Sequence, residues 1–290
     1  ITVLPETPKI PVVVPKSLTE TVISWKISPN ATSYDVTVKG ALVCQTTASS
    51  CTAPVAVGPK TIVAPDFLES KKYPLVLYIH GGPMGSSLEN FDFYAQAMAA
   101  KGWIVFEPNY RGSNNLGKAY QSAVINDAGE GPGKDVMAGI EAVKALGNID
   151  ESKIAVSGWS YGGFMAANCI FQGADVFKSA VAVAPVTSWR YYDSIYTERY
   201  MQTPQENASG YDNNSPISHV NKLKGNFLLI HGTADDNVHV QNTMKMVEAL
   251  VQANKQFDWA IYPDKNHGIY GGKTRLQLYT KMTNFILEKL

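Results

Sequence analysis

A serine flanked by glycines, in the run Gly158-Trp159-Ser160-Tyr161-Gly162, constrains the fold of this chain more than any other stretch. An apolar run precedes it, and a helix-forming segment follows from Tyr161. In a G-x-S-x-G pattern the serine lies on a strained turn between a strand and a helix, where the crowded backbone requires glycine. The pattern therefore predicts that the Ser160 hydroxyl is lifted out of a sheet edge. It also predicts that the Tyr161 N–H faces the place where an oxyanion would form.

The composition of the chain limits the kinds of molecule that it is expected to bind. The chain has 290 residues, with 25 basic and 25 acidic side chains and a formal net charge of zero. No run of lysine or arginine marks a nucleic-acid-binding face, and no apolar stretch reaches the roughly 18 residues that span a bilayer. The sequence begins at Ile1 without a signal-peptide pattern, so we expect that any targeting segment was removed or never present. We expect a peptide or small acyl substrate, no nucleic acid partner and no membrane span.

Three cysteines bear on the compartment. Cys44 and Cys51 are close enough in sequence to pair across a short loop, and such a disulfide would indicate an oxidising compartment. The spacing leaves this disulfide open, and a secreted or periplasmic location is slightly favoured over a cytoplasmic one. Cys169 lies in an apolar helix-forming segment and is expected to be a buried thiol.

The first 58 residues differ in pattern from the rest. Several prolines remove backbone donors in residues 1–16, which are therefore predicted to be a linker. Residues 17–58 contain short runs that alternate apolar and polar positions, which is typical of strands. These runs lie at residues 21–25, 33–38 and 42–44. The small β segment resembles part of a fibronectin type III module, although a complete sandwich needs roughly 100 residues.

From Pro59 onward strand-like and helix-like segments alternate, which indicates an α/β domain over residues 59–290. The strand candidates are near-continuous apolar runs, so we expect a mostly parallel central sheet with helices on both faces. The predicted strands are Tyr73–His80, Trp103–Pro108, Lys153–Gly158, Ser179–Ala184, Phe227–His231 and Phe257–Tyr262. The predicted helices are Phe91–Lys101, Lys134–Leu146, Tyr161–Phe171, Val238–Ala253 and Thr274–Leu290.

An aromatic and polar segment between Pro185 and Leu223 interrupts this alternation. It lies between two predicted strands and therefore above their carboxyl ends. Ligands in open α/β sheets bind at that edge, so we expect this segment to form a wall of a pocket.

An acid and a histidine follow the serine in the order that the α/β-hydrolase fold uses. A serine hydroxyl needs a base to take its proton, and the base needs an acid that fixes its tautomer. Asp235 and His267 each follow a predicted strand, so both lie on loops at the edge that carries Ser160. We therefore predict a Ser160–Asp235–His267 triad. The neighbouring Asp236 is hard to separate from Asp235 on this reasoning.

The loop after the first central strand reads His80-Gly81-Gly82-Pro83. Such a glycine run lets backbone N–H groups approach a substrate oxygen, so Gly81 or Gly82 is predicted to supply the second oxyanion donor beside Tyr161. The alternative is a simple glycine-proline turn.

A metal site is an alternative use of the same region, because His231, Asp235 and His239 recur at four-residue intervals. The segment is predicted as a strand end, a loop and a helix start, so the three side chains do not share one helical face. We expect no metal and no other cofactor.

Four stretches together resemble the prolyl oligopeptidase family, in particular the catalytic domain of its dipeptidyl peptidase IV branch. They are Gly158-Trp159-Ser160-Tyr161-Gly162-Gly163, Ala184-Pro185-Val186 with Trp189 to Tyr200, His231 to His239, and His267-Gly268-Ile269. The resemblance covers about residues 61–290 and implies an α/β-hydrolase fold, a serine peptidase activity and Asp235 as the acid. It also implies a pocket for proline or alanine. The implied pocket residues are Tyr161, Val186, Trp189, Tyr192, Tyr196 and Val238, with Asn237 and Arg199 at its edge.

The chain departs from that branch in two respects. Residues 1–58 are too few for the N-terminal β-propeller that gates the site and supplies glutamates for the substrate amine. His80 also stands where the branch has a tyrosine, which is similar to the acylaminoacyl peptidase branch instead. We expect a serine hydrolase that cleaves amide bonds after proline or alanine through an acyl-enzyme. A broad carboxylesterase and an inactive binding or scaffold protein are the alternatives. The last helix is expected to form a homodimer face, by likeness to the family.

Overall fold

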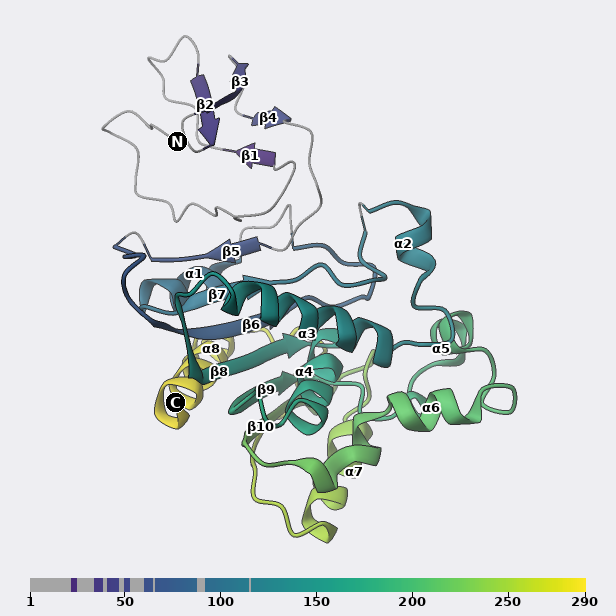
Figure 1. The fold of residues 1–290 in the computed structure, drawn as a ribbon. Helices are drawn as coiled ribbons and strands as arrows, with labels where there is room; N and C mark the ends of the chain where they lie inside the picture. The colour runs from purple at the N-terminus through teal and green to yellow at the C-terminus, as the bar shows by residue number, and fades with distance from the viewer. Residues whose placement is uncertain are drawn as a thin grey trace.

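The computed structural model describes residues 60–64, 66–87, 92–114 and 116–290, together with the backbone of four short strands before them (Figure 1). Strand β1 (Val22–Ser24) pairs antiparallel with β4 (Ser50–Thr52), and β2 (Tyr34–Val38) pairs antiparallel with β3 (Ala41–Thr46). Strands therefore occur at the three places where the alternating runs predicted them. The linker over residues 1–16 lies outside the described residues, as do the side chains of Cys44 and Cys51, so the linker and a disulfide between these cysteines stay predictions. The likeness to a fibronectin module also stays a prediction.

A seven-stranded sheet in the order β11-β10-β9-β8-β6-β7-β5 forms the centre of the domain. All neighbouring strands run parallel except β5, which pairs antiparallel with β7. The strands are β5 Lys60–Ile62, β6 Tyr73–Ile79, β7 Ile104–Glu107, β8 Ile149–Trp159, β9 Ser179–Val183, β10 Asn226–Gly232 and β11 Asp258–Tyr262. The six predicted strands and the mostly parallel sheet are confirmed.

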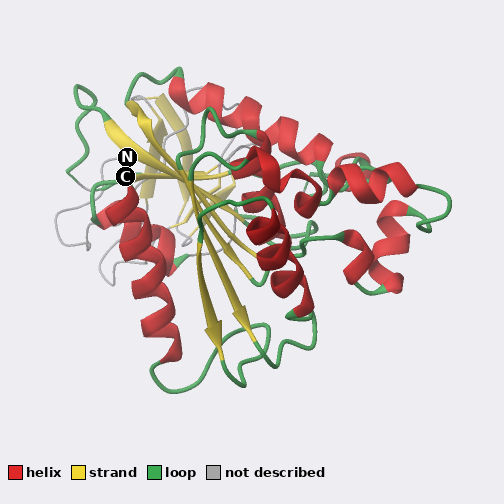
Figure 2. Cartoon of the chain, turned by 90° about the horizontal axis from the view of Figure 1, so that it is seen from below, coloured by secondary structure: helices red, strands yellow, loops and turns green. Residues whose placement is uncertain are grey.

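Helices cover both faces of this sheet (Figure 2). Side chains alternate across β6, so that Leu75 and Leu77 pack into one apolar cluster with α3, α4 and α7, and Val76 packs into a second cluster with α1 and α8. The helices are α1 Phe93–Ala100, α3 Glu130–Lys144, α4 Tyr161–Gln172, α7 Gln241–Gln252 and α8 Thr274–Lys289. All five were predicted, and the α/β-hydrolase architecture is confirmed.

Two helix starts differ from the prediction. Helix α3 begins at Glu130, four residues earlier than expected, because side chains from elsewhere cap its glycine-rich first turn. Asn214 Oδ1 accepts from the Glu130 N–H at 2.7 Å, and Asp127 Oδ2 accepts from the Gly131 N–H at 2.8 Å. Helix α7 begins at Gln241 rather than Val238, because Val238 is held in the preceding loop by the Asp235 carboxylate.

The aromatic segment between β9 and β10 contains helices that the sequence pattern did not predict. They are the 3₁₀ turn η1 (Trp189–Tyr191), α5 (Ser194–Met201), α6 (Ala208–Asn214) and the 3₁₀ turn η2 (Pro216–Lys222). Asp193 and Asn207 cap α5 and α6 through their side-chain oxygens. A further short helix, α2 (Lys118–Ser122), follows β7. Among the described helices, none has the length and apolar character needed to cross a bilayer.

Candidate active site

Ser160 lies on the turn between β8 and α4 with φ 60° and ψ −120°, in the left-handed region that side chains other than glycine avoid. The turn is possible because its neighbours are glycines. A Cβ on Gly158 would lie 2.2 Å from Gly162 O, and one on Gly162 would lie 2.1 Å from Ile79 O. The Ser160 N–H donates to Val183 O at 2.9 Å, which fixes the turn on the neighbouring strand β9. The backbone therefore has the geometry of the predicted elbow, with a partly exposed Ser160.

Asp235 and His267 lie on loops after β10 and β11 and are hydrogen-bonded to each other. His267 Nδ1 lies 2.8 Å from Asp235 Oδ2, while Asp235 Oδ1 accepts from the N–H groups of Asn237 at 3.0 Å and Val238 at 2.9 Å. Burial by itself would raise the pKa of Asp235, but hydrogen bonds from His231 and His267 hold this pKa well below its usual value. Since an ionised carboxylate only accepts, His267 donates this hydrogen bond through its Nδ1–H.

The two adjacent acids differ in environment. Asp235 is 6% exposed, whereas Asp236 is exposed to solvent. Asp235 thus has the surroundings that a base-orienting acid needs, which the sequence pattern alone did not distinguish.

His231 is a second histidine beside the acid, and sequence reasoning considered it only as a metal ligand. It is fully buried; Nε2 lies 2.7 Å from Val238 O and 3.2 Å from Asp235 Oδ2, and Nδ1 lies 2.7 Å from the Thr243 hydroxyl. A carbonyl can only accept, so Nε2 carries the proton and Nδ1 accepts from Thr243. His231 therefore contacts the same carboxylate oxygen of Asp235, Oδ2, that His267 contacts. A histidine at a strand end, four residues before the acid, was the available signal.

The His80–Pro83 loop lies against the elbow. A Cβ on Gly81 would lie 3.3 Å from Trp159 O and 3.7 Å from Ser160 Cβ. Gly82 has φ +129°, which favours glycine, and its carbonyl accepts from the Tyr196 hydroxyl at 2.6 Å. The loop predicted to supply the second oxyanion donor is thus next to Ser160.

His80 is held inside this loop by hydrogen bonds and by a stacking contact. Its Nδ1 donates to Gly81 O at 2.8 Å, its Nε2 accepts from the Ser113 hydroxyl at 2.9 Å, and its carbonyl accepts from the Tyr110 hydroxyl at 2.8 Å. Its ring stacks on Tyr110 with centroids 4.5 Å apart. Burial lowers the pKa of His80, which favours this neutral form. Both ring nitrogens are engaged within the protein, so His80 shapes the loop.

The predicted pocket residues divide into an aromatic group and a buried group. Tyr196 stacks on Trp189 with centroids 6.1 Å apart and meets Tyr192 edge-on at 5.0 Å, and the Tyr192 hydroxyl donates to Asn237 Oδ1. A groove of about 570 Å³ lies beside Tyr192 and Asn237.

Four of the predicted pocket residues are buried in the core cluster, namely Tyr161, Val186, Trp189 and Val238. Tyr161 donates its hydroxyl to Ala128 O at 2.6 Å. Arg199 is exposed on α5.

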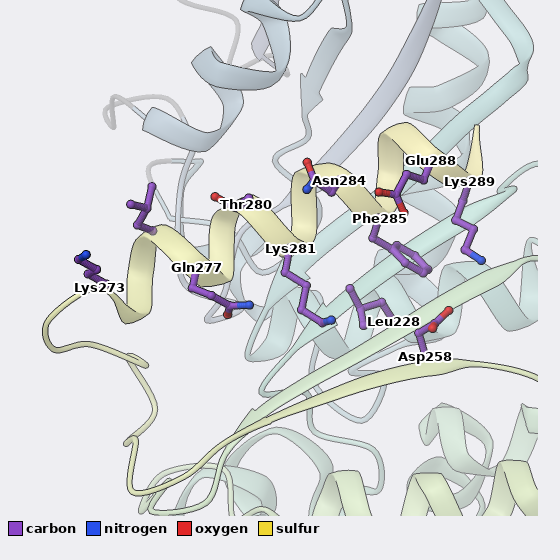
Figure 3. Close-up of a pocket in the computed structure, with 11 residues that line it drawn as sticks. Leu228, Asp258, Lys273, Gln277, Thr280, Lys281, Asn284, Phe285, Glu288 and Lys289 are labelled. Carbon is purple, nitrogen blue, oxygen red and sulfur yellow. The ribbon is translucent and has the colours of Figure 1, made fainter.

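A separate groove of about 640 Å³ runs along α8 beside the starts of β10 and β11 (Figure 3). Polar residues such as Lys281, Asn284 and Lys289 line it together with the apolar Leu228, Leu276 and Phe285. None of the predicted site residues lines it. Leu276 on α8 is 70% exposed and Trp259 on the edge strand β11 is 48% exposed. Dimer formation through α8 stays a prediction.

Curated relatives are similar to most of this chain. The probable dipeptidyl-aminopeptidase B of Paracoccidioides lutzii is 41% identical over 231 residues, which is 77% of this chain and 25% of the relative. The probable dipeptidyl-aminopeptidase B of Botryotinia fuckeliana is 40% identical over the same length. The chain thus spans about a quarter of the length of these relatives.

Solved structures are also similar to most of this chain. Dipeptidyl peptidase 4 of Porphyromonas gingivalis superposes with a TM-score of 0.77 at 42% identity, covering 80% of this chain and 33% of the other. The acylaminoacyl peptidase of Pyrococcus horikoshii superposes with a TM-score of 0.74 at 26% identity, covering 80% and 39%. The model of the prolyl oligopeptidase family matches residues 89–290, which include the elbow, Asp235 and His267. This chain therefore belongs to the prolyl oligopeptidase family.

Proposed function

We propose that the chain is the catalytic part of a serine peptidase, in which Ser160, His267 and Asp235 form a triad. The observation that carries the proposal is the 2.8 Å hydrogen bond from His267 Nδ1 to a buried Asp235 carboxylate, on loops at the sheet edge that carries Ser160. Family membership and relatives named as peptidases support the reaction class.

The proposed reaction begins when His267 Nε2 takes the Ser160 proton and Ser160 Oγ attacks the substrate carbonyl. The resulting oxyanion would accept hydrogen bonds from the Tyr161 N–H, at the first position of α4, and from Gly81 or Gly82. His267 then gives the proton to the leaving amine as the C–N bond breaks, which yields an acyl-enzyme that water hydrolyses by the same steps. Asp235 orients His267 and stabilises its charged form.

We propose further that the acyl side of the site accepts proline or alanine. The flat ring of Tyr196, which stacks on the buried Trp189 and meets Tyr192 edge-on, would stack on a pyrrolidine ring and leave little room for a long side chain. The Tyr192–Asn237 and Tyr196–Gly82 hydrogen bonds fix two of these rings. The relatives named as dipeptidyl peptidases support a peptide as the substrate.

The test compares Gly-Pro anilide, N-blocked Ala-Pro anilide and a short acyl nitrophenyl ester on the wild-type chain and on Ser160→Ala. We expect amide turnover that falls by about 10⁴-fold or more in Ser160→Ala. If only the ester is hydrolysed, the chain is a carboxylesterase and not a peptidase. No Ser160-dependent turnover of any substrate would favour a binding or scaffold protein.

A further inference from the structure

Trp159, the residue immediately before Ser160, is hydrogen-bonded to the backbone of the His267 loop. Its indole Nε1–H donates to His267 O at 2.9 Å. Trp159 ends β8, a central strand paired with β9 through the register Trp159↔Val183. The backbone that carries the base is therefore tied to a rigid strand, one residue from the nucleophile.

Arg275, at the second position of α8, packs over the same indole. Its guanidinium carbon lies 5.0 Å from the centre of the Trp159 ring, 4.8 Å from that of Tyr270 and 5.8 Å from that of Tyr279. Arg275 Nη1 also donates to the Tyr279 hydroxyl at 3.0 Å. These distances fall within the range of cation–π attraction. The segment from His267 to Arg275 thus rests on one indole at both ends.

The middle of that segment is also fixed. Ile269 is fully buried although its φ is +49°, a conformation that a β-branched residue adopts only when its surroundings hold it there. Tyr270 folds back over Gly268, where a Cβ would lie 1.8 Å from the tyrosine ring. The turn after His267 is therefore strained and depends on contacts outside its own backbone.

We propose that Trp159 is a positioning residue for the base His267, and that Arg275 acts through Trp159 by holding the indole in place. This inference rests on the proposed function of Ser160 and His267. Asp235 fixes only the imidazole ring, whereas the Trp159 bond fixes the carbonyl of the same residue. Together they set both the ring and the backbone of His267 relative to Ser160.

The reaction chemistry predicts which substrates are hydrolysed more slowly when His267 is displaced. An amide leaves only after His267 has delivered a proton to its nitrogen, so the reaction depends on the base keeping its place through two proton transfers. A nitrophenyl ester has a leaving group that needs no proton. Displacing His267 should therefore slow amide hydrolysis more than ester hydrolysis.

The experiment measures kcat and KM for an anilide and a nitrophenyl ester, normalised to active sites by burst titration. Trp159→Phe keeps a ring for Arg275 and removes the N–H donor, and Trp259→Phe on β11 is the matched control. We expect Trp159→Phe to lower kcat for the anilide by about 10-fold to 100-fold with little change in KM. We expect a smaller loss for the ester, and wild-type behaviour of the control.

Arg275→Met and the double variant test the second part. If Arg275 acts through the indole, Arg275→Met lowers kcat for the anilide in the wild-type background but adds little in the Trp159→Phe background. Arg275→Lys, which keeps the positive charge, should recover part of the loss.

Three results would overturn the inference: an unchanged anilide kcat in Trp159→Phe, equal losses for anilide and ester, or additive effects of the two substitutions. Ser160→Ala separates the two proposals. If Ser160→Ala abolishes turnover and Trp159→Phe does not alter it, only the positioning role is wrong. If Ser160→Ala retains turnover, the triad itself is wrong.

Discussion

The elbow around Ser160 and the turn after His267 are both strained, but they are held in different ways. Ser160 has φ 60° and Ile269 has φ 49°, so each turn contains a residue that is not glycine in the left-handed region. At the elbow, glycines at positions 158 and 162 let three backbone segments meet almost in contact. At the histidine turn, the constraint comes from side chains on other elements.

This difference determines which amino-acid substitutions each turn tolerates. Backbone crowding at the elbow cannot be relieved, because the atoms that a Cβ on Gly158 or Gly162 would meet are backbone atoms at the end of β6 and in the first turn of α4. The atoms that a Cβ on Gly268 would meet are the far end of the Tyr270 side chain, which is 56% exposed and has room to move. The elbow should be intolerant of added volume, and the histidine turn should be tolerant of it while depending on its hydrogen bonds.

The largest expected effect is that of Gly162→Ala. The added methyl group would lie 2.1 Å from Ile79 O, so β6 and α4 would have to separate. We expect this variant to lose about 3 kcal/mol or more of its free energy of unfolding, as measured by urea denaturation. Gly268→Ala should lose less than about 1 kcal/mol, because Tyr270 can swing away.

Gly133→Ala is the matched control for the substitution itself. Apart from the chain neighbours and the helix's own backbone, no heavy atom lies within 4 Å of a Cβ at this position in α3. Since alanine also favours the helix over glycine, we expect a gain of about 0.5–1 kcal/mol in the free energy of unfolding. Equal losses for Gly162→Ala and Gly268→Ala would contradict the contrast between the two turns.

The second prediction concerns the hydrogen bonds by which Asp235 holds the His267 ring. In Asp235→Asn the N–H groups of Asn237 and Val238 would retain the amide oxygen, which turns the amide NH₂ toward His267. His267 Nδ1 would then have to accept, so Nε2 would carry the proton and could not take one from Ser160. We expect kcat for the anilide to fall by about 10³-fold to 10⁴-fold. We also expect some loss of stability, because the amide NH₂ would face the buried His231 Nε2–H.

Asp236→Asn provides the comparison, because Asp236 is exposed beside the same strand end. It should keep kcat within about threefold of wild type, as is usual for a surface change. A large loss of kcat in Asp236→Asn with activity retained in Asp235→Asn would reverse the assignment of the acid.

The sequence predicted the elements that repeat a pattern and the site features that are local. Six strands of the sheet and its five long helices follow from apolar runs and periodicity, and the elbow follows from the glycines around Ser160. Strand β5 was missed because its three residues are too few to show a pattern. Helices α5 and α6 were missed although Asp193 and Asn207 are N-cap residues, because the aromatic segment between them lacks helical periodicity.

Features that depend on residues far apart in the chain were not predicted. The Trp159–His267 bond joins residues 108 positions apart, and the Asn214 cap of α3 acts across 84 positions. No local pattern encodes such contacts. The residues alone left Asp235 and Asp236 unseparated for the same reason, and the resemblance to the family chose Asp235. In the folded chain, burial and the bond to His267 distinguish the two acids.

The smallest expected effect concerns the His80 loop, which combines both ways of holding a turn. Burial lowers the pKa of His80, so the unfolded chain binds its proton more readily than the folded chain does. The stability that neutral His80 contributes is therefore present above its unfolded pKa of about 6.5 and is lost as pH falls through its lower folded pKa. Tyr110, which stacks on the ring, stays neutral over this range because burial raises its pKa well above the usual value.

We expect the difference in free energy of unfolding between wild type and His80→Asn to shrink as pH falls from 8 toward 5. Asparagine keeps a donor for Gly81 O but cannot titrate, so the other groups cancel in this difference. Urea denaturation at a series of pH values measures it. A difference that stays constant with pH would show that His80 is not held neutral by its loop, and the loop would then resemble the elbow, fixed by its glycines alone.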